Sequence, residues 1–161
     1  MELRFLKSIS WLLRHGAIKE NIAINNEGYI LISDLLLWLE EKKKCKITYE
    51  DLVDIVANDN KGRLTISREY IRANQGHSMD IQINFESYKC KSSQIMHATY
   101  NRNKESIKQN GLKVMSRNYV HLINIDSSCN KFHMIRQDTD LYVFVNGNEI
   151  NLKSSDNGVI L

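Results

Sequence analysis

Four arginines stand at positions where a folded protein often places ligand-binding side chains. A guanidinium group is planar, donates two parallel hydrogen bonds to a phosphate and keeps its charge at any relevant pH. Each of the four lies at the end of an expected helix or strand, where loops carry many binding sites: Arg14, Arg63, Arg72 and Arg117. We interpret them as candidate phosphate ligands, although a single arginine is more often a solvated surface charge.

Five histidines add groups that can donate to phosphate or transfer protons near neutral pH. They are His15, His77, His97, His121 and His133. A metal site built from His77, His97 and His121 would need support from a spacing such as H-x-x-x-H or H-E-x-x-H, and the chain has neither. We therefore expect no metal. A Rossmann G-x-G-x-x-G and a P-loop are also absent, so a bound nucleotide would be held in another way.

The tripeptide Arg14-His15-Gly16 also occurs in histidine phosphatases, where the histidine accepts the phosphate. In those enzymes the motif follows a β-strand. Here residues 8–13 continue a helical pattern, so the strand-to-loop context is not predicted. The phosphatase stays the less favoured interpretation of this motif.

Composition excludes several classes of protein. The net charge of +3 is too small for a surface that tracks nucleic acid along its length, so any contact with RNA must be focused. No apolar run approaches a membrane span of about 20 residues, and no secretory signal is visible, which predicts a cytosolic protein without a membrane. The three cysteines are far apart and in no C-x-x-C pair, which argues against disulfides and structural zinc.

The first half of the chain has mainly helical periodicity. Apolar residues at spacings of three and four predict a helix over residues 2–15, with Arg14 and His15 in its last turn. A strand at residues 29–32 precedes a helix capped by Ser33 that runs to residue 43. Thr48 and Asp51 have the spacing of a capping box for a helix that ends near residue 58. A hairpin at residues 63–67 and 70–73 completes a pattern typical of a winged helix.

The second half changes to extended periodicity. Strands are predicted at residues 80–85, 94–99, 119–123, 141–145 and 150–153, with one helix at residues 103–110 that ends at Gly111. We place the boundary between two lobes in residues 86–93, which gives lobes of residues 1–88 and 89–161. The fold class is α+β, with a mainly β second lobe.

Eight segments resemble the KptA-type tRNA 2′-phosphotransferase family, in the family's order along nearly the whole chain. The eight segments together indicate this family much more specifically than any single segment does. They are SWLLRH at residues 10–15, NEGY at 26–29, NDNKGR at 58–63, IRANQGHS at 71–78, HAT at 97–99, GL at 111–112, MSRNYVHL at 115–122 and NGV at 157–159.

The resemblance implies a winged-helix lobe that binds RNA phosphate and a second lobe of the ADP-ribosyltransferase type that binds NAD. It implies an enzyme of RNA processing, such as tRNA splicing, that transfers an internal RNA 2′-phosphate to NAD. The phosphate attacks the nicotinamide-bearing ribose carbon and expels nicotinamide. The ADP-ribose 2″-hydroxyl then attacks the phosphate, which gives 2′-hydroxyl RNA and ADP-ribose 1″,2″-cyclic phosphate. A monomer is expected.

The resemblance also assigns roles to residues around a cleft between the lobes. Arg14 and Arg63 would hold the 2′-phosphate, His15 would donate to it or assist proton transfer, and Arg117 would stabilise charge during transfer. Arg72 is a further candidate ligand of the substrate phosphate. The residues expected to border NAD, or in part the RNA, are Gln75, Gly76, His77, Ser78, His97, Ala98, Thr99 and His121.

Several features depart from the family pattern, and two of them leave alternatives open. Ala98 stands where glycine is usual, so a methyl group would crowd the backbone's approach to NAD. The chain ends at Leu161, where relatives usually continue into a final strand. If these features prevent NAD binding, the chain would be an RNA-phosphate-binding module. A third alternative is ADP-ribosylation of the terminal phosphates of RNA or DNA, which uses the first step without the second.

Overall fold

The computed structural model describes residues 2–89, 95–125 and 134–161 of the chain. It divides into two compact units, Met1–Asn84 and Phe85–Leu161. The first unit ends shortly before residue 88, where we expected the lobe boundary, because strand β4 (Glu86–Tyr88) pairs with β8 (Leu152–Ser154) of the second unit. Helices and small antiparallel sheets give the α+β class that the sequence predicts.

The first helix of the first unit changes its hydrogen-bonding pattern before it ends. Helix α1 (Glu2–Trp11) continues into a π-helical turn, η1 (Leu12–Gly16), in which the Ala17 amide donates to the Leu12 carbonyl over 2.9 Å. The predicted helix is confirmed, and Arg14 and His15 lie in its last turn. No strand precedes this motif, so the context that a histidine phosphatase needs is absent from this described part of the chain.

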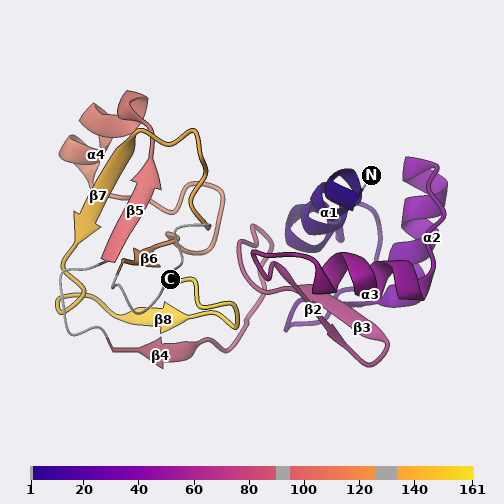
Figure 1. The fold of residues 1–161 in the computed structure, drawn as a ribbon. Helices are drawn as coiled ribbons and strands as arrows, with labels where there is room; N and C mark the ends of the chain where they lie inside the picture. Colours follow the sequence, from indigo (N-terminus) through magenta and orange to yellow (C-terminus); the bar gives the residue numbers. More distant parts are fainter. Residues whose placement is uncertain (1, 90–94, 126–133) are drawn as a thin grey trace. The chain divides into compact units, whose positions relative to one another are not determined.

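Two more helices pack beside a three-stranded sheet (Figure 1). The capping box of α3 (Tyr49–Ala57) is confirmed, since Thr48 Oγ1 accepts from the Asp51 amide over 3.1 Å and Asp51 Oδ2 accepts from the Thr48 amide over 2.8 Å. The cap expected for α2 (Ile32–Lys43) is wrong. The N-cap is Leu31, which has no side-chain cap, and the Ile32 amide donates to the Glu69 carbonyl over 2.9 Å, so the helix begins before Ser33.

The sheet of the first unit has the order β1-β3-β2 and is antiparallel. Strands β2 (Leu64–Ser67) and β3 (Tyr70–Ala73) form the predicted hairpin, and β1 (Tyr29–Leu31) pairs with the other edge of β3. The sheet and helices bury one apolar core, whose fully covered side chains include Ile9, Leu12, Leu13, Ile30, Leu35, Leu39, Leu52 and Ile71.

The strand predicted at residues 80–85 is wrong, because this stretch has no regular structure. Ile81 and Ile83 are buried while Gln82 and Asn84 between and after them are exposed. The Gln82 amide donates to the Asn26 carbonyl over 2.9 Å. The alternating sequence pattern therefore reflects alternating burial of an extended segment that joins no sheet.

The described residues of the second unit form two small sheets and an α-helix (Figure 1). The three-stranded sheet has the order β6-β5-β7, and its strands are β5 (Ile95–Thr99), β6 (Ile123–Asn124) and β7 (Leu141–Val145). Helix α4 (Lys104–Asn110) follows a 3₁₀ turn, η2 (Asn101–Asn103). A core of Ile95, Leu122, Leu152 and Ile160 lies between the sheets and the C-terminal segment.

Most of the predicted elements of this unit are confirmed, and one is largely wrong. Strands β5 and β7 and helix α4 lie where the sequence predicts them, and β8 begins slightly later than expected. The strand predicted at residues 119–123 is reduced to an isolated bridge of Leu122 with Ile160 and the short β6. Among the described residues, the helices include none that is long and apolar enough to cross a bilayer.

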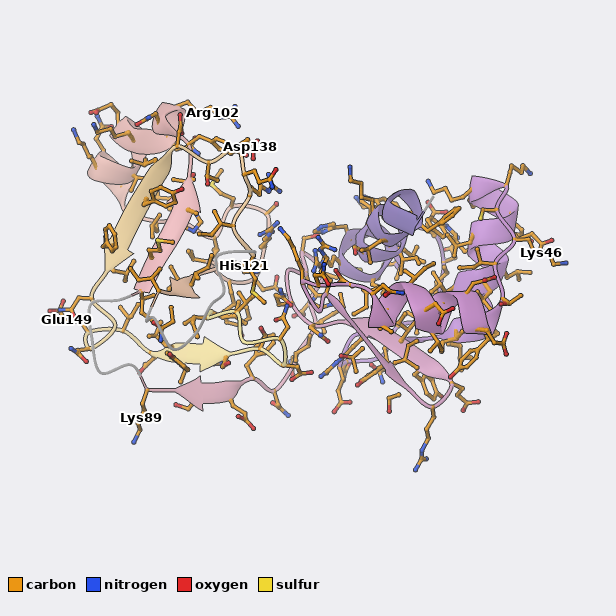
Figure 2. The ribbon with its side chains drawn as sticks, viewed as in Figure 1. Lys46, Lys89, Arg102, His121, Asp138 and Glu149 are labelled. Atoms are coloured by element: carbon orange, nitrogen blue, oxygen red, sulfur yellow. The ribbon has the colours of Figure 1, made fainter. Side chains whose placement is uncertain are left out.

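Contacts around Tyr100 attach the start of α4 to the segment before β7. The Arg102 guanidinium lies 4.5 Å from the centre of the Tyr100 ring, and the Tyr100 hydroxyl donates to Asp138 over 3.0 Å (Figure 2). The Asn101 amide donates to Asp140 Oδ1 over 2.7 Å. These bonds fix the end of β5, the strand that carries three of the predicted NAD-binding residues.

Candidate functional site

Three of the predicted phosphate ligands line one pocket of the first unit. Arg14 and His15 come from the π-helical turn, and Arg63 comes from the loop before β2. The pocket has a volume of about 290 Å³, and its other lining residues are Leu6, Lys7, Ser10 and Trp11. π-Helical turns are frequent at functional sites. The arrangement concentrates cationic donors in a hollow that has room for a phosphate group.

A buried carboxylate holds Arg63 in this pocket. Asp59, whose side chain is only 2% exposed, accepts from Arg63 Nη1 over 2.6 Å, from the Arg63 amide over 2.6 Å and from the Lys61 amide over 3.2 Å. The Arg63 carbonyl accepts from the Asn74 amide over 2.9 Å, which fixes the backbone. One arm of the guanidinium is thus oriented by the protein, and the remaining N–H groups of Arg63 can donate to a bound anion.

Asp59 is a functional residue that is not among the predicted ones. An acidic residue four positions before an arginine, in a loop of turn-forming residues, is the signal that could have indicated it, because aspartate commonly bonds to backbone amides two or more residues later. Its burial, which distinguishes this ion pair from a surface pair, is a property of the folded protein.

The segment after β3 returns to the end of the first helix. Gly76 has φ = 91°, a conformation that side chains disfavour. The Ser78 amide donates to the Arg14 carbonyl over 3.0 Å, and Ser78 Oγ lies 2.8 Å from His15 Nδ1. The structure therefore brings the predicted residues Gln75 to Ser78 beside Arg14 and His15, within the first unit.

His77 is a buried neutral group beside this cluster. Burial lowers the pKa of His77 to about 4, and the nearby charges of Arg14, His15 and Arg72 add to the effect. Its side chain is 4% exposed, and Nε2 hydrogen-bonds to no residue that the structure describes. A Cβ at Gly28 would lie 3.3 Å from this nitrogen. At neutral pH the ring is therefore uncharged and packed against backbone.

We expect this burial to make the stability of the protein depend on pH. Below its unperturbed pKa of 6.5, the unfolded chain binds a proton at His77 that the folded protein binds only near pH 4. The free energy of unfolding should therefore fall as the pH is lowered from about 6.5 to about 4, by about 3 kcal/mol in total. The free energy of unfolding, measured with urea at several pH values in this range, should change less with pH in His77→Gln than in the wild-type protein. An equal pH dependence of the free energy of unfolding in both proteins would show that His77 is not its cause.

Arg72 contacts an aromatic ring. Its guanidinium lies 4.9 Å from the centre of the Tyr29 ring, and the two residues are paired between β1 and β3. Arg72 does not belong to the lining of the pocket described above. Its charge acts on His77, and its role as a ligand of the substrate phosphate stays a prediction.

Gly16 allows the Trp11 ring to lie against the end of the helix. A Cβ at this position would overlap the ring and approach its Cη2 atom to 2.7 Å. Trp11 also stacks on Trp38, with 6.2 Å between the ring centres. Because Trp11 lines the pocket, the backbone at Gly16 helps to define the pocket's wall.

Gly16→Ala should therefore destabilise the protein by about 1–3 kcal/mol, as overpacking does, because the Trp11 ring would be displaced from its stack on Trp38. The displaced indole should also shift the tryptophan fluorescence. Trp11→Leu provides the control background, since without the ring the same Gly16→Ala change should be neutral or stabilising in a helical turn. Thermal unfolding of the wild-type protein, the two single variants and the double variant measures how far the effect of Gly16→Ala depends on the Trp11 ring. An equal penalty in both backgrounds would show that the Trp11 contact is not its cause.

A second cluster of predicted residues lies in the second unit. His97 Nδ1 lies 2.9 Å from the His121 carbonyl, and Arg117 Nη1 lies 3.0 Å from His121 Nδ1 (His121 is labelled in Figure 2). A carbonyl only accepts and a guanidinium only donates, so Nδ1 of His97 carries a proton and Nδ1 of His121 does not. Burial, and secondarily the charge of Arg136, lower the pKa of Arg117. The cluster combines a cation with two histidines in defined tautomers.

The other two predicted residues of this strand lie on opposite faces of it. Successive side chains of a strand alternate, so His97 and Thr99 share one face of β5 and Ala98 lies on the other, opposite Tyr142 of β7. Thr99 Oγ1 accepts from Asn103 Nδ2 over 2.9 Å. The methyl group of Ala98 is therefore directed away from the His97 face.

The whole chain matches one family of proteins. Residues 1–161 match the family described as RNA 2′-phosphotransferase, Tpt1 / KptA family. The chain belongs to this family. Membership confirms the resemblance of the eight segments and makes the protein a transferase. The order of the eight segments was thus a reliable signal.

Individual relatives carry related names. The chain is 29% identical over 177 aligned positions to the Danio rerio protein named tRNA 2′-phosphotransferase 1, covering 99% of this chain and 77% of the relative. It is 34% identical over 131 positions to a probable RNA 2′-phosphotransferase of Pyrococcus horikoshii, covering 81% of this chain and 73% of that protein. A Rhizobium leguminosarum protein with the same name is 34% identical over 122 positions, and the match covers 76% of this chain and 65% of the relative.

Proposed function

We propose that this protein transfers an internal 2′-phosphate of RNA to the ADP-ribose part of NAD. The products would be RNA with a 2′-hydroxyl, ADP-ribose 1″,2″-cyclic phosphate and nicotinamide. The observation that carries the proposal is the pocket in which Arg14, His15 and Arg63 converge in a member of this family. Removal of a 2′-phosphate needs cationic donors arranged around a small anion, and this pocket supplies them.

The two units fit the lobes that such an enzyme would use. Three helices and a sheet of order β1-β3-β2, ending in a hairpin, support a winged-helix lobe for the RNA phosphate. The two small antiparallel sheets of the second unit support an ADP-ribosyltransferase-like lobe for NAD. RNA with a tRNA-like 2′-phosphate would be the partner. A monomeric state and a cytoplasmic location remain predictions.

In this proposal Arg14 and Arg63 hold the phosphate. Its non-bridging oxygens carry charge throughout the transfer, and guanidinium groups fixed in advance stabilise that charge without reorganising. Asp59 orients Arg63 through Nη1, so the arginine needs no rearrangement to donate to the phosphate. His15 donates to the phosphate or assists in proton transfer during the second attack.

The second unit would hold NAD. A cation and two imidazoles suit a dinucleotide that carries phosphates and ribose hydroxyls, and the Ala98 methyl lies on the face away from His97. When bound, NAD supplies a ribose carbon with a good leaving group, nicotinamide. His97 and Thr99 would face the nicotinamide riboside together with His121, and Arg117 would stabilise charge as the phosphate is transferred. The contacts of Gln75, Gly76 and His77 with NAD stay predictions, since these residues lie beside Arg14 and His15.

An oligoribonucleotide with one internal 2′-phosphate tests the proposal. We expect conversion to the 2′-hydroxyl form only when NAD is present, with release of nicotinamide and the cyclic phosphate, as identified by mass spectrometry. Release of inorganic phosphate without NAD would contradict the proposal and favour a phosphatase. Binding without turnover would identify an RNA-phosphate-binding module.

A second oligonucleotide, with a 5′-phosphate and no 2′-phosphate, is the matched control. We expect no product from it at the enzyme concentration that converts the first. ADP-ribosylation of this terminal phosphate in preference to the internal 2′-phosphate would support the alternative activity. An adduct of RNA, phosphate and ADP-ribose that accumulates would show that only the first step occurs.

A further inference from the structure

We propose that Ser78 is a positioning residue that fixes the ring orientation of His15. The inference rests on the proposed function, in which His15 faces the phosphate. Ser78 lies 63 positions away from His15 in the chain, and its Oγ is 2.8 Å from His15 Nδ1. Its amide donates to the Arg14 carbonyl over 3.0 Å. One residue thus binds the backbone of Arg14 and the side chain of His15.

The contact holds the His15 ring through Nδ1. A hydroxyl group can donate to a bare Nδ1 or accept from a protonated one, so the contact restrains the ring in either tautomer. A protonated Nε2, the other ring nitrogen, can donate to a phosphate oxygen. Ser78 therefore limits rotation of the ring and keeps Nδ1 from turning toward the phosphate.

The exposure of Ser78 separates this role from one in packing. Ser78 is exposed, whereas its neighbours Gln75, Gly76 and His77 are buried. Removing the Oγ atom opens no cavity in the core, and the amide bond to Arg14 survives in any variant that keeps the backbone. A change in His15 after this substitution therefore reports the lost hydroxyl contact.

The test compares Ser78→Ala and Ser78→Thr with the wild-type protein, and uses Ser67→Ala as the control, an exposed serine at the end of β2. Nitrogen-15 NMR of labelled histidines, assigned with a His15→Asn variant, reports the hydrogen bonding of the His15 ring nitrogens without any reaction. We expect Ser78→Ala to shift the Nδ1 resonance of His15 and to lower kcat about tenfold, the equivalent of one hydrogen bond. Ser78→Thr should restore both values, and Ser67→Ala should change neither.

Wild-type His15 nitrogen shifts in Ser78→Ala would overturn the positioning role, as would altered shifts with an unchanged kcat. If the wild-type protein fails to act on 2′-phosphorylated RNA, the proposed function fails. The NMR comparison still decides whether Ser78 orients His15, so the two failures are distinguishable.

Discussion

Arg63→Ala should reduce the conversion of 2′-phosphorylated RNA on the order of 10²–10³-fold, the loss typical for a fixed donor to a reacting oxyanion. The guanidinium lines the pocket and is already oriented by Asp59, so no other side chain can take its place without movement. Arg63→Lys should also be strongly impaired, because an ammonium group keeps the charge but loses the planar fork. Filter binding of the 2′-phosphorylated oligonucleotide should weaken in both variants.

In this experiment, lower activity caused by unfolding must be separated from lower activity caused by the missing guanidinium group. Arg63→Ala leaves the buried Asp59 carboxylate without its ion-pair partner, which we expect to cost about 1–3 kcal/mol. The double variant Asp59→Asn/Arg63→Ala removes that unpaired charge and should recover part of the stability but none of the activity. Arg68→Asn, in the exposed turn of the same hairpin where φ is 55°, is the matched control and should behave as wild type. Near-normal turnover of Arg63→Ala would remove Arg63 from the site.

Arg117→Ala should reduce turnover by a similar factor, on the order of 10²–10³-fold, for a different reason. Arg117 donates to His121 Nδ1 and so fixes the tautomer of that ring, in addition to the charge that it supplies. Arg117→Lys should recover little, since a lysine cannot reproduce the fork geometry. Steady-state kinetics with varied NAD measures the effect.

Binding measurements distinguish the two arginines. Arg117→Ala should leave the affinity for the 2′-phosphorylated oligonucleotide nearly unchanged, whereas Arg63→Ala should weaken it. Arg136→Ala is the matched control, because Arg136 is exposed and its charge acts on Arg117. We expect its turnover to stay within about twofold of wild type, as for surface substitutions elsewhere. Loss of RNA affinity in Arg117→Ala with an unchanged kcat would contradict the role in charge stabilisation.

Local sequence determined several features of this protein by itself. The helix that ends in Arg14 and His15, the capping box of Thr48 and Asp51, the β2–β3 hairpin and helix α4 all depend on residues close together in the chain. Helical periodicity, capping and turn formation are short-range effects, so the sequence alone specifies them. The family was predictable for another reason: eight short segments in a fixed order are rarely combined by chance.

Only the tertiary structure decided how these segments meet. The contacts of Ser78 with Arg14 and His15 join parts of the chain that no local pattern relates, and the burial of the Asp59–Arg63 pair depends on the residues that pack around it. Residues 80–85 have the alternation of a strand, but a strand also needs a partner, which the folded protein does not provide here. The types of the residues and of their neighbours in the chain determined the candidate ligands and the helices. Long-range packing decided which ligands share a pocket, because burial and hydrogen-bond partners exist only once the chain has folded.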